Sequence, residues 1–166
     1  MIKTIKGNIL NATELVICNQ VDNTDMNNTD LAKQIKIKYP EVYKEYKWLD
    51  VFTYRLGICQ CVLCNDGKTI ANFFTKIDFS ENELLKFVNN ISNIEGKDWE
   101  FYFLKRSFEE LLLIAKKLNL SIAIPYGIGC SSDKINNKYY DCIEWEVVYN
   151  IIENVFTDYD ITIYSL

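Results

Sequence analysis

Three cysteines lie close together at positions 59, 61 and 64, in a C-x-C-x2-C arrangement that could ligate a metal. A structural zinc needs four ligands, and the chain contains no histidine to supply the fourth. In an extended strand, Cys59 and Cys61 fall on one face and Cys64 falls on the other. The spacing therefore favours thiols buried in the core over a metal site, and we expect neither a metal nor a cofactor.

The absence of histidine also excludes several catalytic arrangements. Neither a Ser-His-Asp triad nor a Cys-His dyad is possible, and no histidine can act as a general base. The formal net charge of −5 argues against nonspecific nucleic-acid binding, because neutralising phosphates needs a basic surface.

The composition indicates one globular domain over residues 1–166, with 49% hydrophobic and 25% charged residues. No run approaches the roughly 18 to 20 apolar residues that a membrane span needs. The opening MIKTIKGNIL is typical of a first strand and not of a signal peptide. Six cysteines without an export signal indicate reduced thiols, so we expect a cytoplasmic protein.

The elements that must position functional residues follow from local signals. Thr29 or Asp30 can cap a helix that Pro40 breaks and restarts. Asn65-Asp66-Gly67 predicts the turn of a hairpin. We expect strands over 2–6, 15–20, 56–64, 69–75, 121–125 and 161–164, and helices over 31–39, 41–49, 80–92, 102–118 and 144–156.

Short buried strands therefore alternate with amphipathic helices. This order favours an α/β fold, a three-layer α/β/α sandwich with a central mixed sheet. In such folds, ligands bind in loops at the carboxyl ends of the strands. The loops over 22–30 and 126–141 are the candidates.

Around these two loops the chain resembles a macro domain, the ADP-ribose-binding module. IKGNIL is similar to the family's opening strand and turn, and SIAIPYGIGC to the strand that enters its second phosphate loop. ICNQV, LAKQIKIKYPEVYKEYK, DGKTIANFFTK and IEWEVVYNIIENVFTDYDITIYSL resemble further family segments, so the likeness covers nearly the whole chain. It implies one macro domain with an insertion around 80–103 and an extended loop over 131–142.

The resemblance also implies an adenine site. The family reads the adenine amino group with an acidic residue after its first strand, and this position is Asn8, followed by Ile9. Asn8 can still accept a hydrogen bond through its amide oxygen, although it also suits a simple turn. Tyr164 matches the family's adenine-stacking aromatic residue, with a core tyrosine as the alternative.

Both phosphate loops depart from the family pattern. Asp22 stands at the ribose-contacting asparagine, and 27–30 replaces the expected glycines, so its aspartates should repel a pyrophosphate unless they point outward. A solvated polar loop is the alternative. The second loop keeps two glycines that permit close approach of a phosphate. The resemblance implies ligand contacts from Asn19, Asp22, Asn28, Asp30, Gly127, Ile128, Gly129, Cys130 and Ser131.

Lys76 and Asp133 are the candidate catalytic residues. The Thr75-Lys76 pair resembles the strand end of macro classes that remove ADP-ribose from glutamate side chains or from DNA. The resemblance implies that Lys76 acts at the anomeric carbon and that Asp133 assists it. A solvated lysine at a strand end is the alternative.

Three functions follow from this pattern. The first is binding of ADP-ribose or an ADP-ribose-derived nucleotide, with sequestration of a cyclic or conjugated immune signal as a phage or bacterial anti-defence role. The second is an ADP-ribosyl hydrolase, for which nucleic acid enters only as an ADP-ribosylated substrate. The third is a pseudo-macro domain that inhibits a protein partner through 80–103.

Overall fold

A computed structural model describes residues 1–22, 26, 29–49, 56–76, 98–130 and 143–166. The strands are β1 (Ile2–Lys6), β2 (Val16–Asp22), β3 (Cys59–Leu63), β4 (Thr69–Lys76), β5 (Ile122–Pro125) and β6 (Ile161–Ser165). The described helices are α1 (Asp30–Lys38), α2 (Pro40–Trp48), α4 (Asp98–Leu118) and α6 (Ile143–Val155), with a short 3-10 turn η1 (Ile9–Asn11). The expected helix over 80–92 and the expected loop over 131–142 lie outside the described residues.

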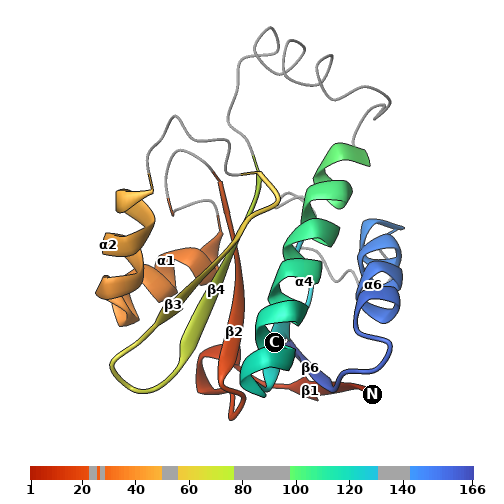
Figure 1. The fold of residues 1–166 in the computed structure, drawn as a ribbon, viewed down its shortest axis with the longest axis horizontal. Helices are drawn as coiled ribbons and strands as arrows, with labels where there is room; N and C mark the ends of the chain where they lie inside the picture. The colour runs from red at the N-terminus through yellow and green to blue at the C-terminus, as the bar shows by residue number, and fades with distance from the viewer. Residues whose placement is uncertain (23–25, 27–28, 50–55, 77–97, 131–142) are drawn as a thin grey trace, which may run out of the picture.

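The strands form one sheet in the order β1-β6-β5-β2-β4-β3. Every pairing is parallel except that of β3 with β4, which is antiparallel. Helices α1 and α2 cover one face of the sheet, and α4 and α6 cover the other (Figure 1). This arrangement confirms the three-layer α/β/α sandwich with a mixed sheet.

The core divides into two layers because side chains alternate along each strand. On β2, Val16 and Cys18 pack toward α4 and α6, whereas Ile17 and Val21 pack toward α1 and α2. Polar residues take the next positions, with Asn19 on the α1–α2 side and Gln20 on the α4–α6 side. None of the helices in the described part of the chain is long and apolar enough to cross a bilayer.

Local chemistry explains most of the element boundaries. The Thr29 hydroxyl accepts a hydrogen bond from the Ala32 N–H at 3.0 Å, so Thr29 is the cap of α1. Pro40 occupies the first turn of α2, where its missing N–H costs nothing. The hairpin turn closes at Gly67, which has a φ of +85°.

Two elements begin three or more residues from the expected start, and the other described starts differ by at most one residue. β3 begins at Cys59 and not at 56, because Gly57 has a left-handed φ of +76° that an extended strand excludes. Helix α4 begins at Asp98, four residues before the expected start. Phe101, one residue before the expected start, packs on the same core cluster as Leu104 and Phe108, so the apolar face of the helix already extends to it.

Candidate functional site

The carboxyl ends of the parallel strands meet at one edge of the sheet, which we call the carboxyl edge. The register pairs Asp22 at the end of β2 with Lys76 at the end of β4, across a bulge that follows Val21. It also pairs Pro125 with Tyr164, and Tyr164 with Ile5. The structure therefore brings the chain positions of the expected first loop, second loop, lysine and aromatic residue to the same edge.

The segment 126–130, the β5 turn, follows β5 directly. Gly127 and Gly129 have φ values of +78° and +83°, which glycine adopts without strain. Among the described residues, a Cβ built on Gly127 meets no atom within 4 Å, whereas one on Gly129 would lie 2.6 Å from Leu104 Cδ2. Gly127 therefore borders open space, and Gly129 allows the turn to pack on α4.

Most backbone N–H groups of the β5 turn are already used within the protein. The Ile128 N–H donates to the Pro125 carbonyl at 3.2 Å, and the Cys130 N–H donates to the Gly127 carbonyl at 3.0 Å. Ile128 and Cys130 are buried in the core. Any phosphate held by this turn must approach on the open side of Gly127, so its binding by Ile128, Gly129 and Cys130 stays a prediction.

Gln20 joins the β5 turn to β4, and sequence reasoning did not identify it. Its side-chain oxygen accepts from the Gly129 N–H at 3.1 Å, and its side-chain nitrogen donates to Thr75 Oγ1 at 2.8 Å. Gln20 is only 5% exposed and Thr75 is fully buried. The buried Gln20 side chain therefore links the β5 turn to the carboxyl end of β4.

A row of amides crosses the opposite face of the sheet. Asn19 Nδ2 donates to Asn72 Oδ1 at 2.9 Å, and Asn72 Nδ2 donates to Gln60 Oε1 at 3.1 Å. Asn19 is fully buried, and its Oδ1 has no hydrogen-bond partner among the described residues. A buried acceptor without a partner is costly, so this oxygen is available to a donor such as a water molecule.

At least one charge of the first loop is exposed to solvent. Asp30 lies in the first turn of α1, its side chain is 88% exposed, and it forms an ion pair of 3.3 Å with Lys33. The Asp22 carbonyl accepts from the Tyr46 hydroxyl at 3.0 Å, and Met26 is fully buried in the α1–α2 layer. The electrostatic penalty expected of Asp30 toward a pyrophosphate is therefore reduced by solvent exposure and pairing.

Asn8 and Tyr164 each use a side-chain oxygen in a hydrogen bond within the protein. The Asn8 side chain caps η1 by accepting from the Leu10 N–H at 2.9 Å, and Ile9 is buried beneath it. The Tyr164 hydroxyl donates to Glu14 Oε2 at 2.8 Å. Adenine recognition by Asn8 and Tyr164 stays a prediction.

Glu14 is a buried carboxylate, 8% exposed, that sequence reasoning missed. Desolvation raises the pKa of Glu14, but hydrogen bonds from Thr162 and Tyr164 outweigh it, and the net direction is downward. Desolvation, followed by the bond to Glu14, raises the pKa of Tyr164. This pair fixes the Tyr164 side chain against the α1–α2 layer of the core.

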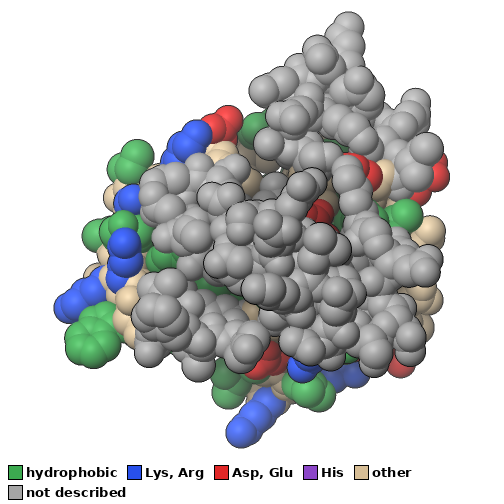
Figure 2. All heavy atoms as spheres, turned by 90° about the horizontal axis from the view of Figure 1, so that it is seen from above, with side chains coloured by type: hydrophobic (Ala, Val, Ile, Leu, Met, Phe, Trp, Pro, Cys, Tyr) green, Lys and Arg blue, Asp and Glu red, His purple; other side chains and the backbone are tan. Residues whose placement is uncertain are grey.

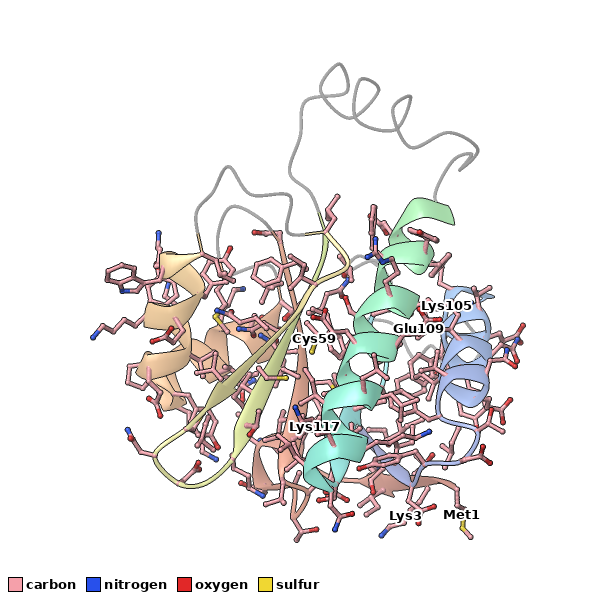
Figure 3. The ribbon with its side chains drawn as sticks, viewed as in Figure 1. Met1, Lys3, Cys59, Lys105, Glu109 and Lys117 are labelled. Carbon is pink, nitrogen blue, oxygen red and sulfur yellow. The ribbon has the colours of Figure 1, made fainter. Side chains whose placement is uncertain are left out.

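Cys59 and Cys61 lie between β3 and α4, where Figure 3 labels Cys59. Cys59 and Cys61 lie on the α4 side, with their Sγ atoms 3.7 Å apart, and Cys64 packs on the other side. This confirms the expected division between the two faces. The hydrogen bond between the two sulfur atoms lowers the pKa of the Cys61 thiol, and the same contact, together with burial, raises the pKa of Cys59.

Lysines gather on the α1–α2 flank, and Lys and Arg side chains line this side in the view onto the carboxyl edge (Figure 2). Lys36 lies over the Tyr43 ring at 4.0 Å from its centroid, and Lys47 lies at 5.5 Å from the same centroid. The lysines of α1 and α2 therefore form a charged flank in which some ammonium groups also contact aromatic rings.

The structure does not describe four of the side chains that the sequence predicts for the site. Asn28, Ser131 and Asp133 lie outside the described residues, and only the backbone of Lys76 is described. Their roles stay predictions. Within the described part of the chain, no group of three or more acidic, cysteine or histidine side chains is arranged to hold a metal ion.

Solved structures share this fold over the whole chain. The macrodomains of Thermus aquaticus DarG and Mycobacterium tuberculosis DarG both match with a TM-score of 0.70. Their identities are 18% and 22%, and the alignments cover 100% of this chain and 99% and 98% of theirs. The chain therefore has the macro domain fold, as its sequence segments indicate.

A third similar structure is a complex with ADP-ribose. Thermosipho africanus DarTG in complex with ADP-ribose matches with a TM-score of 0.61 and 15% identity. The match covers 98% of this chain and 41% of that longer one. No protein-family model matches the sequence, and no curated protein matches it either.

Proposed function

We propose that this protein binds ADP-ribose, or a nucleotide that contains it, at the carboxyl edge of its sheet. The observation that carries the proposal is the β5 turn. Gly127 has a left-handed backbone, and among the described residues no atom lies within 4 Å of a Cβ built on it. A backbone that lacks Cβ at such a point permits close approach of a pyrophosphate. The macro domain fold, and its neighbour in complex with ADP-ribose, support this ligand class.

Calorimetry with matched glycine variants tests the proposal. Gly127→Ala adds a methyl group at the open side of the β5 turn, whereas Gly67→Ala adds one at the remote hairpin. Both glycines have left-handed φ values and no atom within 4 Å of a built Cβ, so the backbone strain is similar. We expect Gly127→Ala to lose about tenfold or more in affinity for ADP-ribose, equivalent to about 1.4 kcal/mol, and Gly67→Ala to bind as wild type. Equal affinities in both variants would place the ligand elsewhere.

Within this ligand class, the specific ligand is a cyclic or conjugated ADP-ribose derivative, which the protein sequesters as an anti-defence function. The loss of glycines from the first loop motivates this choice, because the altered loop departs from one built around plain ADP-ribose. Titration of the wild type with ADP-ribose, cyclic ADP-ribose isomers and amino-acid conjugates ranks these ligands. Sequestration requires the derivative to bind at least as tightly as ADP-ribose and to be recovered unchanged.

Hydrolysis of an ADP-ribosyl bond is the second candidate, and the position of Lys76 favours it. Its backbone pairs with Asp22 at the carboxyl edge and directly follows Thr75, which is bonded to Gln20. Water would displace the protein carboxylate or DNA base, releasing ADP-ribose and the unmodified acceptor. Release of ADP-ribose from modified protein and modified DNA should fall at least 100-fold in Lys76→Ala and in Asp133→Ala. Full activity in both variants would remove these residues from the chemistry.

A further inference from the structure

The backbone ladder between β2 and β5 is short. It pairs only Val16 with Ile122 and Ile17 with Ala123. Beyond these pairs, the two strands approach the carboxyl edge without a further paired register. The Gln20 side chain supplies the connection at this point, because it accepts from the Gly129 N–H at 3.1 Å. The Gln20 side chain thus connects β2 to the β5 turn where the backbone pairing of β2 with β5 has ended.

The other end of the same amide reaches the opposite neighbour of β2. Gln20 Nε2 donates to Thr75 Oγ1 at 2.8 Å, and Thr75 precedes Lys76 in β4. The amide oxygen and nitrogen therefore act on two segments at once, and both contacts are buried. Hydrogen bonds are strong in such surroundings, and leaving either partner unpaired is costly.

The amide row on the opposite face does not duplicate this link. It runs from Asn19 through Asn72 to Gln60, that is, from β2 to β4 and β3, away from β5. Other contacts hold the β5 turn toward α4 and β6. Ile128 and Cys130 are buried in the core, and the Tyr126 N–H donates to the Tyr164 carbonyl at 2.8 Å. The bond between the Gly129 N–H and Gln20 ties the same turn to β2 and, through Thr75, to β4.

We infer that Gln20 is a positioning residue, which sets the spacing between the β5 turn and the carboxyl end of β4. This inference rests on the proposed function, since the spacing matters for a ligand held between these segments. Gln20 is 5% exposed, so its side chain lies inside the protein and not on the surface that a ligand would contact. It therefore controls affinity through Gly129 and Thr75, without a ligand contact of its own.

Two substitutions separate this role from general stability. Gln20→Met keeps the length and removes both hydrogen bonds. Gln20→Glu keeps an acceptor for the Gly129 N–H and can accept from the Thr75 hydroxyl, because a hydroxyl can donate as well as accept. Val62→Ala, in the α1–α2 layer of β3, is the control for a comparable loss of stability at a remote position.

Hydrogen exchange across 126–130 and ADP-ribose affinity are the two measurements. We expect Gln20→Met to exchange about tenfold faster at this turn and to bind about tenfold more weakly. Gln20→Glu should restore slow exchange toward wild type but not the affinity, because a buried carboxylate repels a pyrophosphate, and Val62→Ala should change neither. Unaltered exchange in Gln20→Met overturns the link, and altered exchange with full affinity overturns the positioning role. A wild type that binds no ADP-ribose refutes the proposed function only, and the exchange data then decide the link by themselves.

Discussion

Alanine at Gly129 should destabilise the protein far more than alanine at Gly127, although both glycines have left-handed backbones. The common cost is the conformation, because an L-residue at these φ values loses about 1 to 2 kcal/mol. For Gly129 a second cost arises from packing. A Cβ there would lie 2.6 Å from Leu104 Cδ2 and 3.2 Å from Val148 Cγ2.

These neighbours have little freedom to move away. Leu104 is 1% exposed and Val148 is fully buried, so the added methyl group would overpack the contact between α4 and α6. Overpacking of a closed core costs about 1 to 3 kcal/mol. We therefore expect Gly129→Ala to lose about 2 to 5 kcal/mol in the free energy of unfolding, and Gly127→Ala only about 1 to 2 kcal/mol.

Urea denaturation of the two variants, with Gly67→Ala as the reference, measures these differences. Gly67→Ala carries the same kind of strain with no atom within 4 Å of the added methyl group. Its midpoint should match that of Gly127→Ala, and Gly129→Ala should unfold at a clearly lower urea concentration. Equal midpoints in all three variants would refute the packing role assigned to Gly129.

Three further predictions concern other residues. Tyr164→Ala should weaken ADP-ribose binding about tenfold while Tyr164→Phe stays within about threefold of wild type, because stacking uses the ring and not the hydroxyl; calorimetry that finds no loss with alanine removes the stacking role. The lowered pKa of Glu14 contributes stability that is fully present above its ordinary value of 4.5 and is lost as the pH falls through the folded pKa. Urea midpoints below pH 4.5 should therefore fall less steeply in Glu14→Gln than in wild type, and parallel curves would contradict this. Burial raises the pKa of Cys64 to about 11, whereas the pKa of Cys61 is lowered. Iodoacetamide at neutral pH should therefore modify Cys61 faster than Cys64, and Cys59→Ala should slow the modification of Cys61. Peptide mapping that shows Cys64 reacting first would contradict this order of pKa values.

Much of the fold could be predicted from local patterns. The strand β2 is buried on both faces, as expected for a parallel strand between two helix layers. The hairpin turn at Gly67 and the α1 cap at Thr29 each depend on residues a few positions apart, so their signals are contained in the sequence. The later start of β3, after Gly57, was not predicted, because the sequence does not show which φ a glycine adopts.

The candidate site was only partly predictable. Family resemblance located the glycines of the β5 turn, but it did not distinguish open Gly127 from packed Gly129. Gln20 escaped notice because its partners Thr75 and Gly129 lie 55 and 109 residues away. Glu14 escaped for the same reason, since its partner Tyr164 is 150 residues distant. Such side-chain contacts exist only after the sheet has formed.

Titration of the wild-type protein with ADP-ribose by calorimetry tests the central claim most directly. The account predicts saturable binding of one ligand per chain, weakened by Gly127→Ala and retained in Gly67→Ala. The absence of binding at high micromolar concentrations of ADP-ribose and its cyclic and conjugated derivatives would contradict it.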